Sequence, residues 1–239
     1  MYVIYIMGGT MDKFSLDNQV ERVIRGENSY FLNPVDTRYL VNHIKKHVNN
    51  YHIFKLFDAA EKLIVYRDKL DITLFEIKTS SYLEHREILG ALFSHNLNDN
   101  SFGDIIISNG RYFIVVLNIL KDYMKNSFIS IGKKKVKLVE VDLYLVKDYK
   151  LNYLDLNINV SSIRLDNVIS KLLPTSRSNC CNLIKEKKVI VNYNICSNKN
   201  YILNDNDIFS IRGIGKFKYI CVNYVKTNGK MSILIKKYM

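Results

Sequence analysis

Residues 161–191, SSIRLDNVISKLLPTSRSNCCNLIKEKKVIV, decide the fold of the last third of this chain. Apolar residues recur at helical spacing on both sides of Pro174, and the residues from Val189 onward are typical of a strand. A proline ends a helix because it has no N–H group and its ring clashes with the preceding turn. The stretch therefore predicts a helix, a turn, a second helix capped by Thr175 or Ser176, and a strand.

The second of these helices carries cations at both ends. Lys185, Lys187 and Lys188 lie toward its C-terminus, where the helix dipole favours positive charge whether or not a ligand is bound. Arg177 lies at the opposite end, where a cation is unfavourable unless an anion such as phosphate occupies the free N–H groups. Asp166, in the first helix, is placed to pair with an arginine and hold it in position. The pattern favours a phosphate-binding surface.

Positive charge is concentrated in the same third of the chain. Residues 161–239 contain 14 Lys/Arg and 4 Asp/Glu, a balance of +10, whereas residues 1–160 have a balance of +2. A basic domain of this kind indicates a polyanionic partner such as nucleic acid. The alternative, a charged surface that only keeps the protein soluble, stays open.

The chain as a whole has the composition of a soluble protein. Its apolar fraction is 48%, and no apolar run approaches the ~18 residues of a membrane span. We therefore expect a cytosolic protein that does not enter a membrane. Met11 is the expected native start, because Gly8-Gly9 is typical of a translated ribosome-binding site. A short N-terminal strand is the alternative for residues 1–10.

Two further domains are predicted upstream of the basic region. The first is an N-terminal α/β domain over residues 11–70. Its predicted elements are a helix at residues 15–25, a helix that begins at Asn33-Pro34, and strands at residues 51–58 and 62–67.

The second has the order β-α-β-β-α-β of a ferredoxin-like domain, over residues 71–146. Its signals are an alternating strand at residues 71–78, a Ser81/Glu84 capping box that begins a helix, and an Asn109-Gly110 hairpin. Residues 147–160 are expected to form a connector with some strand character, which contains the last domain boundary.

RNA-recognition motifs share the ferredoxin-like topology and stack bases on aromatic rings of the sheet. Tyr112 and Phe113 lie on the third strand, but neighbouring residues face opposite sides of a sheet. We therefore favour one core ring and one surface ring over a stacking pair. In the basic region, Gly213 and Gly215 predict a tight bend beside Arg212.

No catalytic residue, metal site or cofactor is expected. The four cysteines form no C-x-x-C pair, and His43 and His47 have no third ligand nearby. A methyltransferase needs a glycine-rich loop after a strand, and none precedes residue 161. A pseudouridine synthase needs a catalytic aspartate in a large domain, and the domain around Asp104 is too small.

The basic region resembles the S4-type RNA-binding domain, which has the αL motif. The resemblance rests on Arg164-Leu165-Asp166, Ser176-Arg177-Ser178, Leu183-Ile184, Val189 to Asn192, and Ser210 to Phe217. Together with FLNPVDTRYL and EHREILGALFSHNLNDNSFGDIII upstream, the chain is similar to YlmH-type proteins. These have an N-terminal domain, a ferredoxin-like middle domain and a C-terminal S4-type domain. The segment LFDAAEKLIV departs from the family because it lacks an expected glycine-rich stretch.

The resemblance implies an α+β protein with an S4-type domain over residues 161–239. It implies a non-enzymatic factor, expected to be a monomer, that binds large-subunit ribosomal RNA and peptidyl-tRNA beside ribosome-rescue factors. The alternative is an RNA-modifying enzyme of the pseudouridine synthase or methyltransferase type. The residues expected to bind RNA are Arg164, Asp166, Ser176, Arg177, Lys185, Lys187, Lys188, Asn192, Arg212, Lys216 and Lys218.

Overall fold

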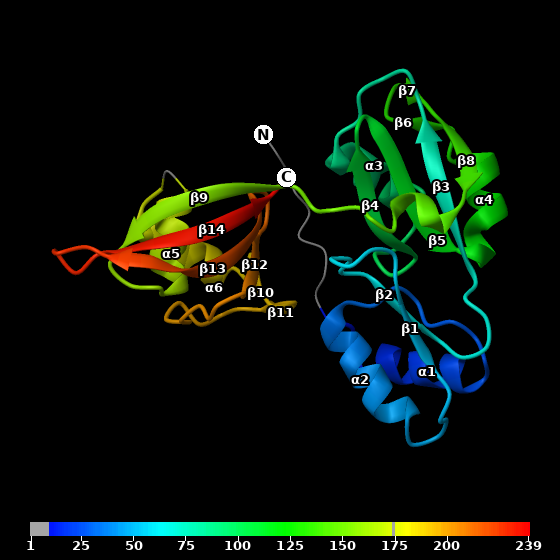
Figure 1. The fold of residues 1–239 in the computed structure, drawn as a ribbon, viewed down its shortest axis with the longest axis horizontal. Helices are drawn as coiled ribbons and strands as arrows, with labels where there is room; N and C mark the ends of the chain where they lie inside the picture. The colour runs from blue at the N-terminus through cyan, green and yellow to red at the C-terminus, as the bar shows by residue number, and fades with distance from the viewer. Residues whose placement is uncertain (1–9, 174) are drawn as a thin grey trace. The chain divides into compact units, whose positions relative to one another are not determined.

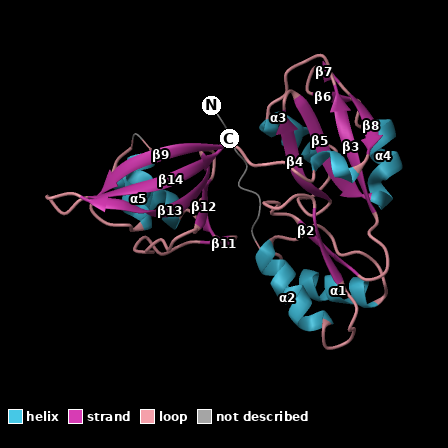
Figure 2. Ribbon diagram, viewed as in Figure 1, coloured by secondary structure: helices cyan, strands magenta, loops and turns pink. Residues whose placement is uncertain are grey.

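The computed structural model describes residues 10–173 and 175–239, apart from the side chain of Arg177. It divides into two compact units, residues 10–150 and residues 151–239 (Figure 1). Each unit contains both helices and strands, so the predicted α+β class is confirmed (Figure 2). No helix of the described part is long and apolar enough to cross a membrane. The expected start at Met11 and the alternative strand over residues 1–10 both concern residues 1–9, which lie outside the described part.

The N-terminal part of the first unit combines two helices with a two-stranded sheet. Its elements are α1 (Lys13–Ile24), α2 (Pro34–Ile44), β1 (His52–Lys55) and β2 (Leu63–Tyr66). Asn33 caps α2 as predicted, because its side chain accepts from the backbone N–H groups of Val35 and Asp36, both at 2.9 Å. Pro34 occupies the first helical position, where its missing N–H has no consequence.

The rest of the first unit is an antiparallel sheet in the order β4-β5-β3-β8, with two helices. Its elements are β3 (Ile72–Lys78), α3 (His85–Ser94), β4 (Phe102–Ser108), β5 (Arg111–Leu117), η1 (Asn118–Leu120), α4 (Lys121–Ser127), β6 (Ser130–Ile131), β7 (Lys134–Lys135), β8 (Lys137–Val141) and η2 (Leu143–Val146). The predicted ferredoxin-like order is confirmed. Asn109 and Gly110 both have positive φ, as a two-residue hairpin requires.

The predicted start of α3 is wrong by three residues. Ser81 is not the cap; Glu84 is, and its backbone N–H donates to Glu87 Oε2 at 2.9 Å. The residues just before α3 are held by a hydrogen bond to the sheet: the backbone N of Leu83 donates to the Tyr112 hydroxyl at 2.9 Å. A tertiary contact therefore decides where this helix begins.

The sheet of the first unit is covered on both faces. Tyr112 belongs to the core that includes α3, and Phe113, on the opposite face, is only 3% exposed. The expected surface position for one of these rings is therefore wrong. The N-terminal part supplies cover on the second face, where Phe31 lies close to Gly103 and Val115. The sheet has no open aromatic face on which bases could stack.

The second unit is a six-stranded antiparallel sheet with two helices, in the order β11-β10-β12-β13-β14-β9. Its elements are β9 (Tyr153–Val160), α5 (Leu165–Leu172), α6 (Arg177–Lys185), β10 (Val189–Val191), β11 (Asn194–Ile195), β12 (Ile208–Ile211), β13 (Gly215–Val225) and β14 (Met231–Tyr238). The connector expected at residues 147–160 is thus partly an edge strand. β9 pairs along its whole length with β14, a partner far along the chain.

One face of this sheet packs on α5 and α6. Val168 and Ile169 of α5, and Cys180 and Ile184 of α6, are fully buried against inward-facing residues of the strands. The two helices follow β9 in the sequence and lie against the sheet of the second unit (Figure 1). Because side chains alternate along a strand, the polar residues of β13 and β14 point to the other face.

Candidate RNA-binding surface

The start of α5 fixes one cation of the predicted site. Arg164 donates from Nε and Nη2 to the two carboxylate oxygens of Asp166, at 3.2 and 3.0 Å, and from Nη2 to Asn200 Oδ1 at 2.6 Å. Asp166 is 1% exposed and also accepts from the backbone N of Asn167. The predicted pairing of Asp166 with an arginine is confirmed. A forked pair fixes the plane of the guanidinium group and so the direction of its other N–H groups.

Two residues predicted to contact RNA turn inward. Asp166 has almost no exposed surface, so it positions Arg164 and cannot meet a phosphate itself. Asn192 donates from Nδ2 to Asp207 Oδ1 at 2.7 Å and accepts at Oδ1 from the backbone N of Ile208 at 3.0 Å. Its amide therefore links the end of β10 to the start of β12. Sequence reasoning assigned both residues to RNA because it could not show that their side chains form hydrogen bonds within the protein.

The N-terminus of α6 has the predicted cap. Ser176 accepts from the backbone N of Asn179 at 3.2 Å, which decides between the two cap candidates. Arg177 is the first residue of the helix, next to N–H groups that could hold a phosphate. Its side chain lies outside the described part of the structure, so its contact with RNA stays a prediction.

The C-terminal end of α6 gathers several exposed cations. Lys185 is the last helical residue, and Lys187 follows with a left-handed φ of 57°. The backbone N of Lys188 donates to Leu183 O at 3.0 Å, which is the closing bond of a helix ending that usually has glycine at the left-handed position. Lys188 Nζ lies 2.6 Å from Glu186 Oε2, so one of these charges is partly neutralised.

Arg212 joins this group from the turn between β12 and β13. Its backbone N donates to Lys188 O at 2.9 Å, which places the turn beside the end of α6. The Arg212 side chain is exposed. The structure therefore brings Arg212 together with the cations at the end of α6, whereas the sequence indicated only a tight bend beside it.

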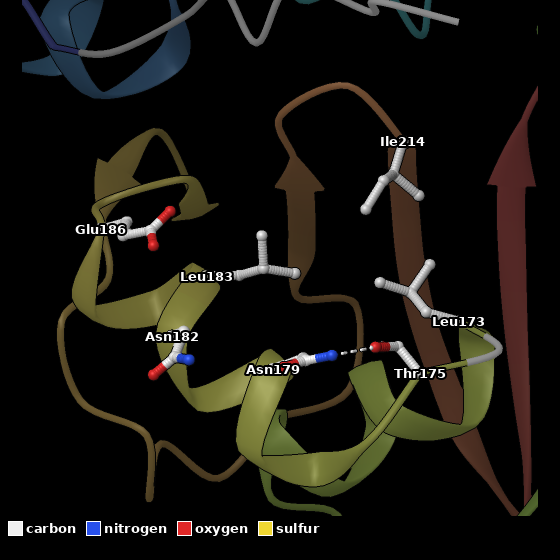
Figure 3. Close-up of a pocket in the computed structure, with 7 residues that line it drawn as sticks. All are labelled: Leu173, Thr175, Asn179, Asn182, Leu183, Glu186 and Ile214. Carbon is white, nitrogen blue, oxygen red and sulfur yellow. Dashed lines mark hydrogen bonds between the residues drawn. The ribbon is translucent and has the colours of Figure 1, made fainter. Parts of the chain in front are cut away.

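An open pocket of about 500 Å³ lies between α6 and the β12–β13 turn (Figure 3). Its lining residues are Leu173, Thr175, Asn179, Asn182, Leu183, Glu186 and Ile214. Figure 3 shows apolar side chains from both sides of the hollow and carboxamides along α6, where Asn179 Nδ2 donates to Thr175 Oγ1 at 2.9 Å. An apolar floor beside amide groups suits a flat polar group such as a nucleobase.

Sequence reasoning missed the polar face of this pocket. The signal was present, because Asn179, Asn182 and Glu186 recur at intervals of three and four, which places them on one side of a helix. The sequence did not show that the β12–β13 turn packs opposite this side.

Lys216 and Lys218 do not belong to the α6 surface. They flank Phe217, which is 3% exposed and points into the core with α5 and α6. Both lysines therefore point to the opposite face of the sheet. The predicted site is split into a group around α5 and α6 and a pair on the outer face.

Cys180 and Asp104 both have structural surroundings. Burial raises the pKa of the Cys180 thiol, as for a small core residue, and a protonated thiol is a poor nucleophile. Asp104 accepts from the backbone N–H groups of Glu61 and Lys62 at 3.1 and 3.0 Å, so it holds a loop. Among the described residues, no group of three or more His, Cys, Asp or Glu is placed to hold a metal ion.

Two family models match this chain. Residues 66–144 match the family described as "Putative RNA-binding domain in YlmH", and residues 163–209 match the S4 domain. In these two stretches the chain is similar to YlmH-type S4-domain proteins. The first match covers the ferredoxin-like sheet, and the second covers α5, α6 and the strands up to β12. Both matched domains are RNA-binding domains, and the predicted family is confirmed.

One curated relative is "Ribosome-associated protein quality control protein P2" of Bacillus subtilis (strain 168). It is 33% identical over 137 residues, which are 56% of this chain and 52% of that protein. The match thus spans about half the length of this relative. A solved structure, "Cell division protein ylmH from Streptococcus pneumoniae", aligns with 61% of this chain and 99% of its own, at 20% identity and a TM-score of 0.49.

Proposed function

We propose that this YlmH-type protein is a non-enzymatic, cytosolic RNA-binding factor, monomeric when free, that acts on the large ribosomal subunit. It binds ribosomal RNA and peptidyl-tRNA there, beside ribosome-rescue factors, when stalled subunits are rescued. The observation that carries the proposal is the cation group around α5 and α6. Arg164 is held by a buried carboxylate, and Lys185, Lys187 and Arg212 are exposed at the end of α6.

Each part of this surface has a chemical role in RNA binding. The cations neutralise phosphates and fix the position of the protein on the RNA backbone. The pocket beside α6 accepts a base or the edge of a ribose between its apolar floor and the two asparagines. Recognition then depends on the shape of a folded RNA more than on its sequence. The name of the Bacillus subtilis relative supports the ribosome as the place of action.

Sedimentation of cell lysate through a sucrose gradient at low salt tests this function. The test variant is Lys185→Gln/Lys187→Gln/Arg212→Gln in the tagged full chain. The matched control, Lys13→Gln/Lys45→Gln/Lys46→Gln, removes the same charge from exposed positions of the first unit. The wild type and the control are expected with free large subunits, and the test variant at the top of the gradient.

The outcomes separate the parts of the proposal. A wild type that stays at the top even at low salt contradicts binding to the ribosome. If the test variant and the control sediment alike, the α6 surface is not the contact. With purified RNA, each cation removed should flatten the dependence of log affinity on log salt concentration by roughly one unit.

A further inference from the structure

Tyrosine rings and lysines cross the outer face of the sheet in the second unit, on the side away from α5 and α6. Tyr153 on β9 and Tyr238 on β14 are cross-strand partners, and their rings meet edge to face with centroids 5.0 Å apart. Lys216 Nζ lies 5.1 Å from the ring centroid of Tyr238 and 5.6 Å from that of Tyr193. We call Tyr153, Tyr238 and Tyr193 the tyrosine row.

A second line of charge runs beside the tyrosine row. Lys218 and Lys236 are cross-strand partners on the same face, and Lys236 Nζ lies 5.2 Å from the ring centroid of Tyr153. Asp155 Oδ1 lies 4.0 Å from Lys236 and offsets that charge. Lys216 and Lys218 add two further lysines to this face, on β13, one of the inner strands of the sheet.

Tyr193 provides an independent observation. It occupies the second central position of the two-residue turn between β10 and β11, with a φ of 67°, after Asn192 with a φ of 46°. Glycine is the usual residue at that position, because a side chain there is strained. A large ring kept in a left-handed conformation indicates a role of the ring that outweighs the strain.

We propose that this outer face binds unpaired RNA, with bases stacked on the tyrosine row and phosphates on Lys216 and Lys218. The inference rests on the proposed function and adds a second RNA contact opposite the α6 surface. Tyr153, Tyr238 and both lysines lie outside the stretch that matches the S4 domain, residues 163–209. Aromatic rings beside cations are the means by which proteins hold single strands.

A base stacked on a tyrosine ring is a stronger contact than the lysine that lies over the ring when no RNA is bound. A lysine over an exposed ring strengthens an interaction about two- to fivefold. A base stacked on the same ring strengthens binding about fivefold to more than 100-fold. An incoming strand therefore displaces the ammonium groups from the rings and offers them phosphates in exchange.

Fluorescence anisotropy with the full chain tests the proposal. The probes are a labelled 12-nucleotide oligouridine and a labelled 12-base-pair RNA duplex. The test variants are Tyr193→Gly, which also relieves the strained turn, and Tyr193→Gly/Tyr238→Leu. The control, Tyr82→Leu/Tyr144→Leu, removes two exposed rings of the first unit.

We expect the double variant to bind oligouridine about tenfold or more weakly and the duplex as the wild type does. Its salt dependence should not change, because no charge is lost, whereas Lys216→Gln should flatten the slope by roughly one unit. Tyr193→Gly alone should weaken oligouridine binding without lowering the melting temperature. This variant keeps the test valid if the double variant does not fold.

Unchanged oligouridine affinity in both tyrosine variants overturns the proposal and assigns this face to another partner, such as a protein. A wild type that binds the duplex and sediments with large subunits, but does not bind oligouridine, also overturns it and leaves the proposed function intact. A wild type that binds neither probe nor the ribosome contradicts both.

Discussion

A substitution at Asp166 has two opposite expected effects on RNA binding: it removes a negative charge, and it loosens Arg164. Asp166→Asn removes a negative charge beside the proposed RNA surface, and charge alone would strengthen RNA binding. We expect the opposite, a loss of about three- to tenfold, because an amide cannot accept both N–H groups that Arg164 donates to the carboxylate. Affinity for large-subunit ribosomal RNA in a filter-binding assay measures this.

Asp205→Asn is the matched control, because Asp205 is an exposed acid of the same unit. Its RNA affinity should stay the same or rise. If Asp166→Asn also binds more tightly than the wild type, Asp166 does not position Arg164 for RNA.

The left-handed backbone of Lys187 lowers the stability of the fold, whereas its side chain is proposed to bind RNA. Its left-handed φ of 57° follows the end of α6, where glycine is favoured. Lys187→Gly should raise the free energy of unfolding by about 0.5–1 kcal/mol. It should also weaken RNA binding and flatten the salt slope by roughly one unit. Thermal melts and a salt titration of binding measure the two effects.

Asn206→Gly provides the comparison, because Asn206 has a φ of 72° in an exposed turn. The Asn206→Gly variant should be more stable than the wild type, with no change in RNA affinity. The gain should be smaller than for Lys187→Gly, because asparagine tolerates the left-handed conformation better than lysine does. A Lys187→Gly protein that is more stable and binds RNA normally would show that the lysine has no part in binding.

At the scale of elements, Gly103 on β4 tests how the N-terminal part covers the first sheet. A Cβ at Gly103 would overlap Val115 Cγ1 and lie 2.9 Å from a ring carbon of Phe31. Gly103→Ala should therefore lower the free energy of unfolding by about 1–3 kcal/mol. In contrast, Gly90 is exposed in α3 with no atom near the added Cβ, and Gly90→Ala should raise it by about 0.5–1 kcal/mol.

Urea unfolding of both variants measures this difference of sign. If Gly103→Ala and Gly90→Ala change the free energy of unfolding equally, Phe31 can move aside, and the contact between the N-terminal part and the sheet is loose.

The pair between β3 and β5 predicts a dependence on pH. Glu76 is 3% exposed, and hydrogen bonds from the Arg111 guanidinium, at 2.8 and 2.9 Å, lower its pKa to about 2. A carboxyl with a lowered pKa stabilises the fold above its unfolded value, near 4.5, and this stabilisation is lost as the pH falls toward 2. Glu76→Gln should therefore cost about 1–3 kcal/mol at pH 7.

The difference between Glu76→Gln and the wild type should narrow steadily below pH 4.5. Chemical unfolding at pH 7, 4 and 3 measures it. A gap that stays constant over this range would show that the pair does not respond to the charge on Glu76.

Elements that depend on near neighbours were predictable from the sequence. The Asn33 cap, the Ser176 cap and the Asn109-Gly110 turn each depend on residues within a few positions. The strand β9 was expected mainly as a connector, because its partner β14 lies at the other end of the unit. The burial of Phe113 was missed because the cover on that face of the sheet depends on residues distant in sequence, as Phe31 beside Gly103 shows.

The candidate site was predictable in kind but not in arrangement. Sequence alone identified the cations around α5 and α6 and the pairing of Asp166. It grouped Lys216 and Lys218 with them, because alternation shows which residues share a face but not which face meets the helices. The tyrosine row was missed because its members come from three separate parts of the second unit.

At the scale of the whole molecule, charge and fold divide at the same place. Residues 151–239 contain 14 Lys/Arg and 5 Asp/Glu, a balance of +9, and residues 10–150 have a balance of +3. The basic unit also has its own core, in which α5, α6 and the sheet take part. These two facts predict that the second unit folds alone and carries most of the affinity for RNA.

Two fragments test where this unit begins. Residues 151–239 include the edge strand β9, whereas residues 161–239, the boundary predicted from sequence, omit it. Without β9, the fully buried Ile233 and Ile235 lose the neighbours that Leu156 and Ile158 provide on the core face. The shorter fragment should be less stable by at least about 2 kcal/mol, because that much apolar surface becomes exposed.

Thermal unfolding followed by circular dichroism compares the two fragments, and residues 10–150 serve as the control in an RNA-binding assay. Residues 151–239 should unfold cooperatively and keep the salt slope of the full chain. Residues 10–150 should bind RNA at least tenfold more weakly, because their positive and negative charges nearly balance, at +3. Equal stability of the two fragments would make β9 an accessory strand. Equal RNA affinity of both units would instead place a second strong contact in the ferredoxin-like part. Because the sheet of that part is covered on both faces, the contact would have to come from its loops and helices.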